Sequence, residues 1–424
     1  MGGGGDGRGL GAPGRAVRIL YLAPVDLSRA GGQAVHLRRI CTALEDRGHE
    51  VRLLVHRPRG EHSWAGPDGG LVLAGGSDAF FLPRLRHFAS EWALSRALRR
   101  ESRRFRPDLL LVRQEALSIA PWLAGMTSRR RPLPLVVESN SSLPSVAASA
   151  HASPARVAWL ASWEGRLLRA ADAVGAVTAA LAASHAREYG VAEDRLFCVP
   201  NGAWIPPSLG PSSADVRRAE GVGEAEFLVT FAGNLNVVQG VDLLLAVLAE
   251  DYPGRIRCWI IGEASARAAQ EERARSLGAR VEFLGALSEE ETVRHLQASQ
   301  VVVAPYRADD YARIVGGPSS LKVLTALACD RPLLLTDAPG LESLREVASV
   351  TLVAAGDTRA WAEAIRAHMG DWRRARQPLY DWPWPEGQGS GRRFIEAGRT
   401  WDHTAAAWEA AFTRATSGSR RRSR

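Results

Sequence analysis

The sequence predicts an α/β protein built from two doubly wound domains. Apolar runs of strand length alternate with amphipathic helical segments along most of the 424 residues, and this alternation favours parallel sheets covered by helices on both faces. A stretch rich in Pro, Ser, Gly and Ala, residues 205–224, interrupts the alternation, which then restarts. The chain is also too long for one ordinary core, so two large domains are expected.

The first series follows a leader rich in glycine, residues 1–16, and predicts an N-terminal Rossmann-like domain over residues 17–204. Apolar residues that recur every three to four positions indicate its helices, and short apolar runs indicate its strands. The expected strands are 17–23, 50–55, 108–112, 134–137, 173–177 and 196–199, the expected helices are 33–47, 80–105, 157–169 and 181–189, and 61–79 is expected to be a loop. Gly31 and Gly32 do not complete a GxGxxG pattern, which disfavours a dehydrogenase.

The second series predicts a C-terminal Rossmann-like domain over residues 226–371, after a linker at 205–225. The expected strands are 227–231, 256–261, 281–284, 301–304, 333–335 and 351–353, and the expected helices are 241–248, 264–277, 289–297, 321–328 and 358–368. Residues 372–416 are expected to be an irregular segment and a closing helix that returns to the N-terminal domain. Residues 417–424 form a basic tail.

Composition bounds the class of protein and its surroundings. Apolar content of 46% and charged content of 24% fit a globular protein, and no run reaches the roughly 18 apolar residues that span a bilayer. The four cysteines, which are far apart in the sequence and lie in apolar runs, are expected to be buried free thiols. A cytoplasmic location follows as the expectation.

The basic excess comes almost entirely from arginine. The 54 basic and 46 acidic residues give a net charge of +8. Nucleic acid is disfavoured as a partner, because there is no zinc finger, RNP motif or interleaving of basic and aromatic residues. A solvated basic surface is one reading, and peripheral contact with anionic lipid at the inner face of the membrane is another that stays open.

The stretch from Ala304 to Thr336 has the order strand, polar loop, helix, strand. In open α/β sheets, ligands bind at such loops, beyond the carboxyl ends of the strands. Gly316 and Gly317 let backbone N–H groups approach an anion, while Ser319 and Ser320 are expected to cap the helix, whose positive end favours phosphate. Lys322 adds a positive charge. The pattern indicates a diphosphate site, with a capped helix and a solvated lysine as the alternative.

A second group of polar residues lies at strand ends of the N-terminal domain, facing the presumed cleft. Glu138 is a candidate to orient or deprotonate a hydroxyl group, although an ion pair with Arg113 is equally consistent. Asn140 lies two residues after Glu138. His36 follows Gly32 on the first expected helix. It is either a residue that reaches a phosphate or a hydroxyl group, or a structural histidine. The GxSxG and GxxxxGK[ST] motifs are absent, which disfavours a serine hydrolase and a P-loop enzyme.

Four segments together resemble GT-B glycosyltransferases of family 4, in order and in spacing: GGQAVHLRRICTALEDRGHEV, ADAVGAVTAALAASHAREYGVAEDRLFCVPNGAW, FLVTFAGNLNVVQGVDLLLAVLA and RVEFLGALSEEETVRHLQASQVVVAPY. The resemblance implies two Rossmann-like domains facing a central cleft, a nucleotide-sugar donor on the C-terminal domain and an acceptor on the N-terminal one. It also implies transfer with retention, no metal and no cofactor besides the nucleotide-sugar co-substrate. Asp309 and Asp310 are therefore expected to be solvated rather than to bind a metal.

The chemistry and the resemblance together nominate three sets of site residues. The catalytic candidates are Lys322, Arg307 and Glu138, with a surface arginine as the alternative for Arg307. The donor-binding candidates are Gly233, Asn234, Gln239, Gly262, Glu263, Leu287, Ser319, Ser320, Leu321 and Thr325. The acceptor-side candidates are Gly32, His36, Arg113 and Asn140.

The chain departs from the family pattern at three donor-side positions. Asn234 and Gln239 stand where many members have basic residues, and Thr325 stands where members often have an acidic one. The expected activity is transfer of a sugar from a nucleotide-diphosphate donor to a hydroxyl acceptor on a glycan, a lipid-linked intermediate or a secondary metabolite. The alternative is a non-catalytic GT-B protein that binds a partner or a nucleotide sugar without turnover.

Overall fold

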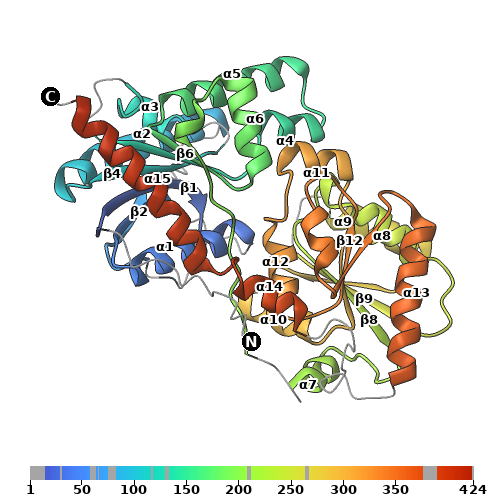
Figure 1. Ribbon diagram of the computed structural model, residues 1–424. Coiled ribbons are helices and arrows are strands. Elements are labelled where there is room, and N and C mark those ends of the chain that lie inside the picture. The colour runs from blue at the N-terminus through green and yellow to red at the C-terminus, as the bar shows by residue number, and fades with distance from the viewer. Residues whose placement is uncertain are drawn as a thin grey trace, which may run out of the picture.

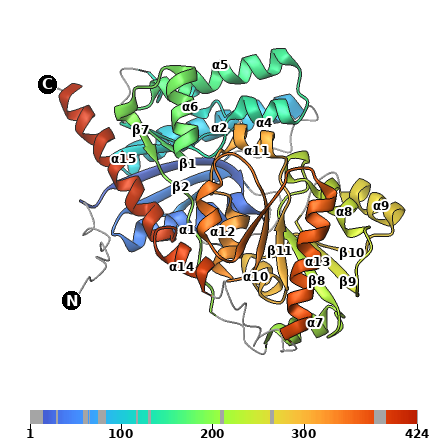
Figure 2. The same ribbon diagram turned by 45° about the vertical axis from the view of Figure 1, so that its right-hand side comes forward.

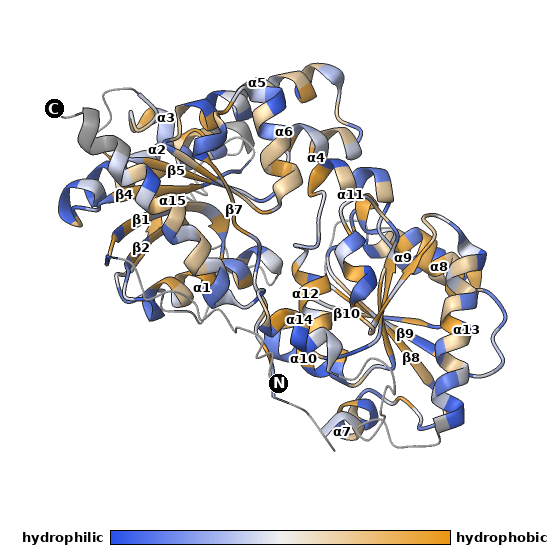
Figure 3. Cartoon of the chain, in the orientation of Figure 1, coloured by the Kyte–Doolittle hydropathy of each residue, from blue (hydrophilic) through white to orange (hydrophobic). Residues whose placement is uncertain are grey.

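Two parallel β-sheets, each covered by helices on both faces, make up the computed structural model of the chain (Figure 1). The structure describes residues 15–28, 31–57, 64, 66–74, 83–115, 118–128, 133–207, 212–262, 267–375 and 389–422. Apolar residues concentrate on the strands, and hydrophilic residues on the outer surfaces of the helices (Figure 3). The two doubly wound sheets that the alternation predicted are therefore confirmed.

The first sheet has seven strands in the order β3-β2-β1-β4-β5-β6-β7. Its strands are β1 (Arg18–Asp26), β2 (Glu50–His56), β3 (Leu71–Ala74), β4 (Leu109–Arg113), β5 (Leu135–Ser139), β6 (Ala173–Ala176) and β7 (Leu196–Cys198). All neighbouring strands are parallel, and Arg113 on β4 lies opposite Glu138 on β5. Polar residues at these strand ends therefore meet at one edge of the sheet.

Helices cover the two faces of this sheet with separate apolar cores. The helices of this half are α1 (Gly32–Asp46), α2 (Pro83–Arg104), α3 (Ala120–Leu123), α4 (Leu143–Ser149), α5 (Pro154–Ala170), α6 (Ala179–Tyr189), α15 (Trp401–Arg422) and the short 3-10 helix η1 (Glu193–Arg195). One core joins the sheet to α1 and α15 through Leu37 and Trp408. The other joins it to α2 and α5 through Leu94 and Leu167.

The second sheet has six strands in the order β10-β9-β8-β11-β12-β13. Its strands are β8 (Phe227–Ala232), β9 (Ile256–Ile261), β10 (Val281–Gly285), β11 (Val301–Ala304), β12 (Leu333–Thr336) and β13 (Val350–Val353). The associated helices are α7 (Ser212–Ala219), α8 (Val241–Leu248), α9 (Arg267–Leu277), α10 (Glu289–Gln297), α11 (Ala308–Ile314), α12 (Leu321–Ala328), α13 (Thr358–Ala375), α14 (Ser390–Glu396), and the 3-10 helices η2 (Val237–Gln239) and η3 (Glu342–Glu346).

Several short elements lie where loops were expected, because tertiary contacts stabilise them. Residues 71–74 form an edge strand paired with β2. Residues 308–314 form α11, which buries Tyr311 and Ile314 on one face. Within the expected linker, α7 docks through Arg217, whose guanidinium donates a 3.0 Å hydrogen bond to Gln300.

The last helix returns to the first sheet. The helix α14 packs on α12, and α15 then packs on α1 and β6, as Figure 1 shows. On this arrangement we propose domain limits of 17–204 and 226–371. In that division α7 is an ordered part of the linker, and α15 joins the N-terminal domain.

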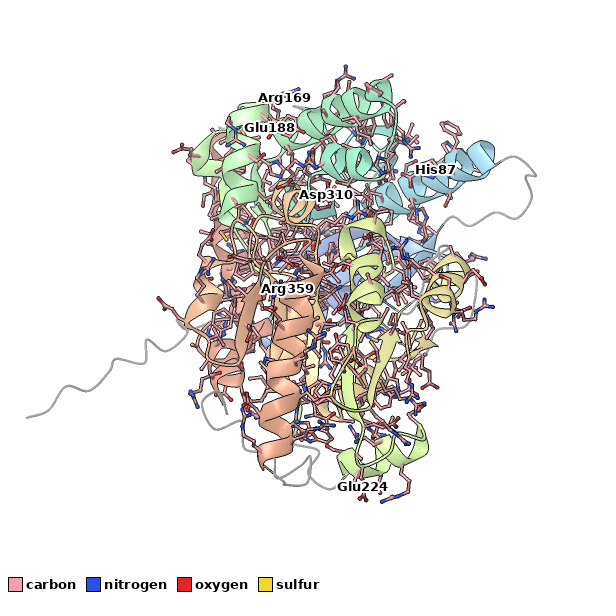
Figure 4. All side chains as sticks on the ribbon, turned by 90° about the vertical axis from the view of Figure 1, so that its right-hand side faces the viewer. His87, Arg169, Glu188, Glu224, Asp310 and Arg359 are labelled. Carbon is pink, nitrogen blue, oxygen red and sulfur yellow. The ribbon has the colours of Figure 1, made fainter. Side chains whose placement is uncertain are left out.

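The two halves also touch directly through a pair of short helices. The helices α4 and α11 pack together (Figure 2), and the Ser149 hydroxyl donates a 2.7 Å hydrogen bond to Asp310. This bond lowers the pKa of Asp310. The expectation that Asp310 is solvated is therefore wrong, because α11 turns this carboxylate towards Ser149 of the N-terminal half. Figure 4 labels Asp310 where the two halves meet.

Three of the four cysteines are buried free thiols, as expected. Cys198, at the end of β7, is exposed, so that part of the expectation is wrong. The alternation on this short edge strand leaves its last side chain outward. No helix among the described residues is long and apolar enough to cross a bilayer.

The return of α15 depends on Trp408. A Cβ atom at Gly175 would lie 2.4 Å from the Trp408 ring, so the indole occupies the space that the glycine leaves on β6. Trp408→Ala should lower the free energy of unfolding by about 3–5 kcal/mol, measured by denaturant titration, because a large buried side chain leaves a cavity. The matched control, Trp159→Ala, removes an indole that is 45% exposed and should cost about 1 kcal/mol or less. Equal losses would contradict this anchoring role.

Candidate functional site

A pocket of about 460 Å³ lies between the two halves, beside the N-terminus of α12. Asn140, Val177 and Asn201 line it from the N-terminal half. The residues that line it from the C-terminal half come from the β8–α8 connection, the end of β11, the helix α11 and the start of α12, and include Gln239, Tyr306, Tyr311, Ser319, Ser320 and Leu321. The pocket therefore lies beyond the carboxyl ends of strands, where α/β sheets bind ligands.

Lys322 projects from the first turn of α12 into an aromatic surrounding. Its Nζ atom lies 4.0 Å from the ring centroid of Phe231 and 5.0 Å from that of Tyr306, and it donates a hydrogen bond to the side-chain oxygen of Gln239. Among the described residues no carboxylate pairs with it. Burial therefore lowers the pKa of Lys322 well below its usual value.

Lys322 is also the only lysine in the chain, and all other basic residues that count towards the 54 are arginines. A lysine carries a compact point charge on a flexible stem, whereas an arginine carries a broad, planar fork. The space around Lys322 suits an ammonium group better than a guanidinium group, because the Nζ atom lies only 2.7 Å from the point that a Cβ atom at Gly233 would occupy. Gly233, with φ of +152°, therefore leaves room for the ammonium group.

Ser319 and Ser320 do not cap α12, so the expected capping role is wrong. The N-cap residue Ser320 makes no side-chain cap hydrogen bond, because its hydroxyl lies 2.5 Å from the Tyr306 hydroxyl. The Ser319 hydroxyl instead accepts a 2.8 Å hydrogen bond from the backbone N–H of Asn201. The first-turn N–H groups of α12 therefore lack a side-chain cap, which is the arrangement that binds anions.

The glycine pair ahead of α12 brings the two halves together. A Cβ atom at Gly317 would lie 2.8 Å from Cγ2 of Thr178, and the Thr178 hydroxyl donates a 2.5 Å hydrogen bond to the carbonyl of Val315. Gly316 has φ of +61° and approaches Ala180 in the same way. The pair thus seats the loop on the start of α6, as well as shaping the entry to α12.

Glu138 lies at the centre of a buried polar cluster in the N-terminal half. Its Oε1 atom accepts hydrogen bonds from Arg113 at 2.9 Å and Asn140 at 2.5 Å, and lies 2.6 Å from Nε2 of His36. The Tyr21 hydroxyl donates to Oε2. Burial alone would raise the pKa of Glu138, but the neighbouring His36 and Arg113 hold it well below its usual range.

A hydrogen-bonded chain joins this cluster to the start of α12. The Asn201 amide nitrogen donates to the carbonyl of Ser319 at 2.8 Å, so its oxygen faces Nδ1 of His36 at 2.9 Å. His36 in turn meets Glu138 through its other ring nitrogen. The buried Glu138 cluster and the start of α12 are therefore linked through His36 and Asn201, of which Asn201 lines the pocket.

The remaining site candidates lie at different distances from this centre. The Arg307 guanidinium is about half exposed and forms a 3.0 Å ion pair with Asp242 at the start of α8. This arrangement fits the alternative that Arg307 is a surface arginine. Asn234 is exposed, while Leu287 and Thr325 are partly buried. Glu263 lies outside the described residues.

Two glycine candidates allow close packing. A Cβ atom at Gly32 would lie 3.3 Å from Cδ1 of Leu321, across the interface between the halves. Gly262 has φ of +135°, and a Cβ atom there would lie 1.9 Å from the carbonyl oxygen of Gly233. The loop after β9 can therefore approach the loop after β8 because position 262 is glycine.

Sequence reasoning missed Tyr21, Asn201, Phe231 and Tyr306. Three of them are aromatic residues on or after apolar strands, where a core role is the ordinary expectation, and nothing local indicates that they face a charged group. Asn201 belongs to the Pro-Asn-Gly sequence near the end of the second segment that resembles family 4. Its place in the sequence, between the two domains, was the available signal.

Two family models match the chain. The model of Glycosyltransferase Family 4 matches residues 30–203, and the model of Glycosyl transferases group 1 matches residues 226–371. The D-inositol 3-phosphate glycosyltransferase of Nocardia farcinica is 29% identical over 419 residues, which cover 92% of this chain and 86% of that protein.

Solved structures with the same fold include sucrose-phosphate synthase from Thermosynechococcus elongatus and HepE from Anabaena in complex with UDP and glucose. The first has a TM-score of 0.69 at 21% identity and covers 92% of this chain and 96% of that one. The second has a TM-score of 0.65 at 18% identity, with coverage of 94% and 99%. At these identities the similarity shows the fold.

The lowered pKa of Lys322 predicts that anion binding at α12 takes up a proton. A bound diphosphate would raise the pKa of Lys322, so between the free and bound pKa values binding requires protonation, and affinity should fall as pH rises through that window. Calorimetry with a sugar nucleotide, in buffers of different protonation enthalpy, would measure the proton uptake. Lys322→Arg, charged throughout, should show none, and an unchanged affinity across the alkaline range for the parent protein would contradict the prediction.

Proposed function

Because the chain belongs to glycosyltransferase family 4 and has the GT-B fold, we propose that it transfers a sugar from a nucleotide-diphosphate donor to a hydroxyl group of an acceptor. The observation that carries the proposal is the ammonium of Lys322, which has no carboxylate partner among the described residues and lies at the start of a helix whose N-cap makes no side-chain cap bond. This arrangement supplies charge and N–H donors to a diphosphate.

The donor side would stabilise the leaving group. As the bond to the sugar breaks, negative charge develops on the diphosphate, and a preorganised cation with helix N–H groups lowers the energy of that state. Gln239 now accepts the hydrogen bond that a phosphate oxygen would accept from Lys322, so binding exchanges one acceptor for another. The complex of HepE with UDP supports a nucleoside diphosphate as the ligand class.

The proposal includes retention of configuration at the anomeric carbon. It also includes stabilisation of the negative charge on the diphosphate by Lys322 and the N-terminus of α12. Two measurements on the transfer reaction would test these details. Activity that persists in a strong chelator would support charge stabilisation by the protein itself, and the anomeric configuration of the product would be read by NMR. Loss of activity in chelator with recovery on adding a divalent ion would contradict the first detail.

Glu138 would position groups rather than remove a proton. Three side chains donate hydrogen bonds to this carboxylate, and its lowered pKa makes it a weak base. Its contact with His36 and the link through Asn201 hold the buried imidazole beside Asn201, which lines the pocket. We propose that this cluster orients the acceptor side for transfer, with Asn140 as the member that lines the pocket.

Replacing Lys322 tests the proposed function directly. Lys322→Ala should lower kcat/KM by about 100-fold or more, since it removes the cation that faces the developing charge, and should abolish the thermal stabilisation by the cognate nucleotide. Gly233→Ala keeps the lysine but crowds its ammonium, so it should reduce both quantities as well. The screen uses UDP, GDP, ADP, dTDP and their common sugars, followed by donor hydrolysis and transfer. Full turnover in Lys322→Ala would refute the proposal, and tight binding without turnover in the parent protein would favour a non-catalytic role.

A further inference from the structure

We propose that the outer face of α2 binds the surface of an anionic lipid bilayer. The outer face is defined by seven residues of the N-terminal domain: Phe88, Trp92, Arg96, Arg99, Arg100, Arg103 and Arg104. All seven are exposed. The proposal concerns binding only, so it holds or fails independently of the proposed transfer reaction.

The helix has two clearly different sides. Leu94, Ala97 and Leu98 are buried against the first sheet, while the outer-face residues recur at spacings of three and four, which places them along the opposite side. Figure 4 labels His87 near the start of this helix, at the edge of the molecule and away from the second sheet. With 22 residues, α2 is about 33 Å long, so its outer face is a long, straight strip suited to a flat partner.

The charge on this strip is of one sign. Its five arginines line a hollow of about 430 Å³, and the two acidic residues of α2, Glu91 and Glu101, are both buried. Glu101 pairs with Arg52 and Arg100, and the other four arginines of the strip have no carboxylate partner among the described residues; Arg99 donates instead to the carbonyls of Leu123 and Ala124. Guanidinium groups gathered in this way bind phosphate oxygens.

Aromatic side chains distinguish a bilayer from a soluble polyanion. Phe88 is 53% exposed and Trp92 is 50% exposed, and the Arg96 guanidinium lies over the Trp92 ring at 4.8 Å. Trp159 on α5 is the third exposed aromatic residue of the described chain, and α5 covers the same face of the sheet as α2. Aromatic rings beside arginines are typical of helices that lie in the interface between headgroups and acyl chains.

Vesicle flotation with the full chain tests the proposal. The protein should float with vesicles of phosphatidylglycerol and phosphatidylcholine but not with phosphatidylcholine alone, and binding should weaken as salt rises. The triple variant Arg96→Gln, Arg103→Gln, Arg104→Gln should bind at least about tenfold more weakly, because each arginine near the surface adds electrostatic attraction. The double variant Phe88→Ser, Trp92→Ser should lose the part of binding that survives high salt.

A matched control removes the same charge elsewhere. Arg273→Gln, Arg280→Gln, Arg294→Gln changes three exposed arginines of the C-terminal half and should keep vesicle binding within about twofold of the parent. Unfolding midpoints confirm that each variant is folded. Equal loss in the two triple variants, binding to neutral vesicles alone, or no vesicle binding by the parent would overturn the proposal. Binding only to a single-stranded oligonucleotide, lost in the arginine variant and kept in the aromatic one, would overturn it in favour of nucleic acid.

Discussion

The site is organised around one ammonium group that the fold encloses without a counter-charge among the described residues. Taking a lysine out of water costs free energy unless an anion compensates it, and here the partners are two aromatic rings and a neutral amide. Packing around the lysine offsets this cost. Gly233 leaves space for the ammonium group, and Phe231 and Tyr306 are held in place because they belong to the apolar cores on the second sheet. Binding of a negatively charged ligand would therefore stabilise the charged form of this lysine more than binding of a neutral one.

Charge is balanced in opposite ways in the two halves around the pocket. In the C-terminal half the Lys322 ammonium has no carboxylate partner among the described residues, whereas in the N-terminal half the carboxylate of Glu138 is surrounded by hydrogen-bond donors. The first arrangement favours binding of a charged ligand, and the second fixes neighbouring groups in place. Because Asn201 bonds to both His36 and Ser319, the geometry of one side depends on the seating of the other.

The alternation of apolar strands and helices was enough to predict both sheets, since each buried strand is apolar in its own right. Lys322 could also be nominated as a site candidate from the local pattern, because a loop, a glycine pair and a helix start are contiguous in the sequence. The bonds of Asn201 were not predictable in this way, as its partners lie 165 and 118 residues away. The wrong capping prediction has two causes: Asn201, 118 residues away in the sequence, engages the Ser319 hydroxyl, and Tyr306, only 14 residues away, engages that of Ser320.

The most direct test of this account is an NMR titration of the Lys322 side chain. Since the chain has a single lysine, protein labelled at lysine with ¹³C and ¹⁵N gives one side-chain signal that needs no assignment. The account predicts a pKa well below the ordinary lysine value of about 10.4 in the free protein, and a rise in that pKa when the cognate nucleotide binds. A signal that titrates at the ordinary value, and does not respond to any nucleotide that stabilises the protein, would contradict it.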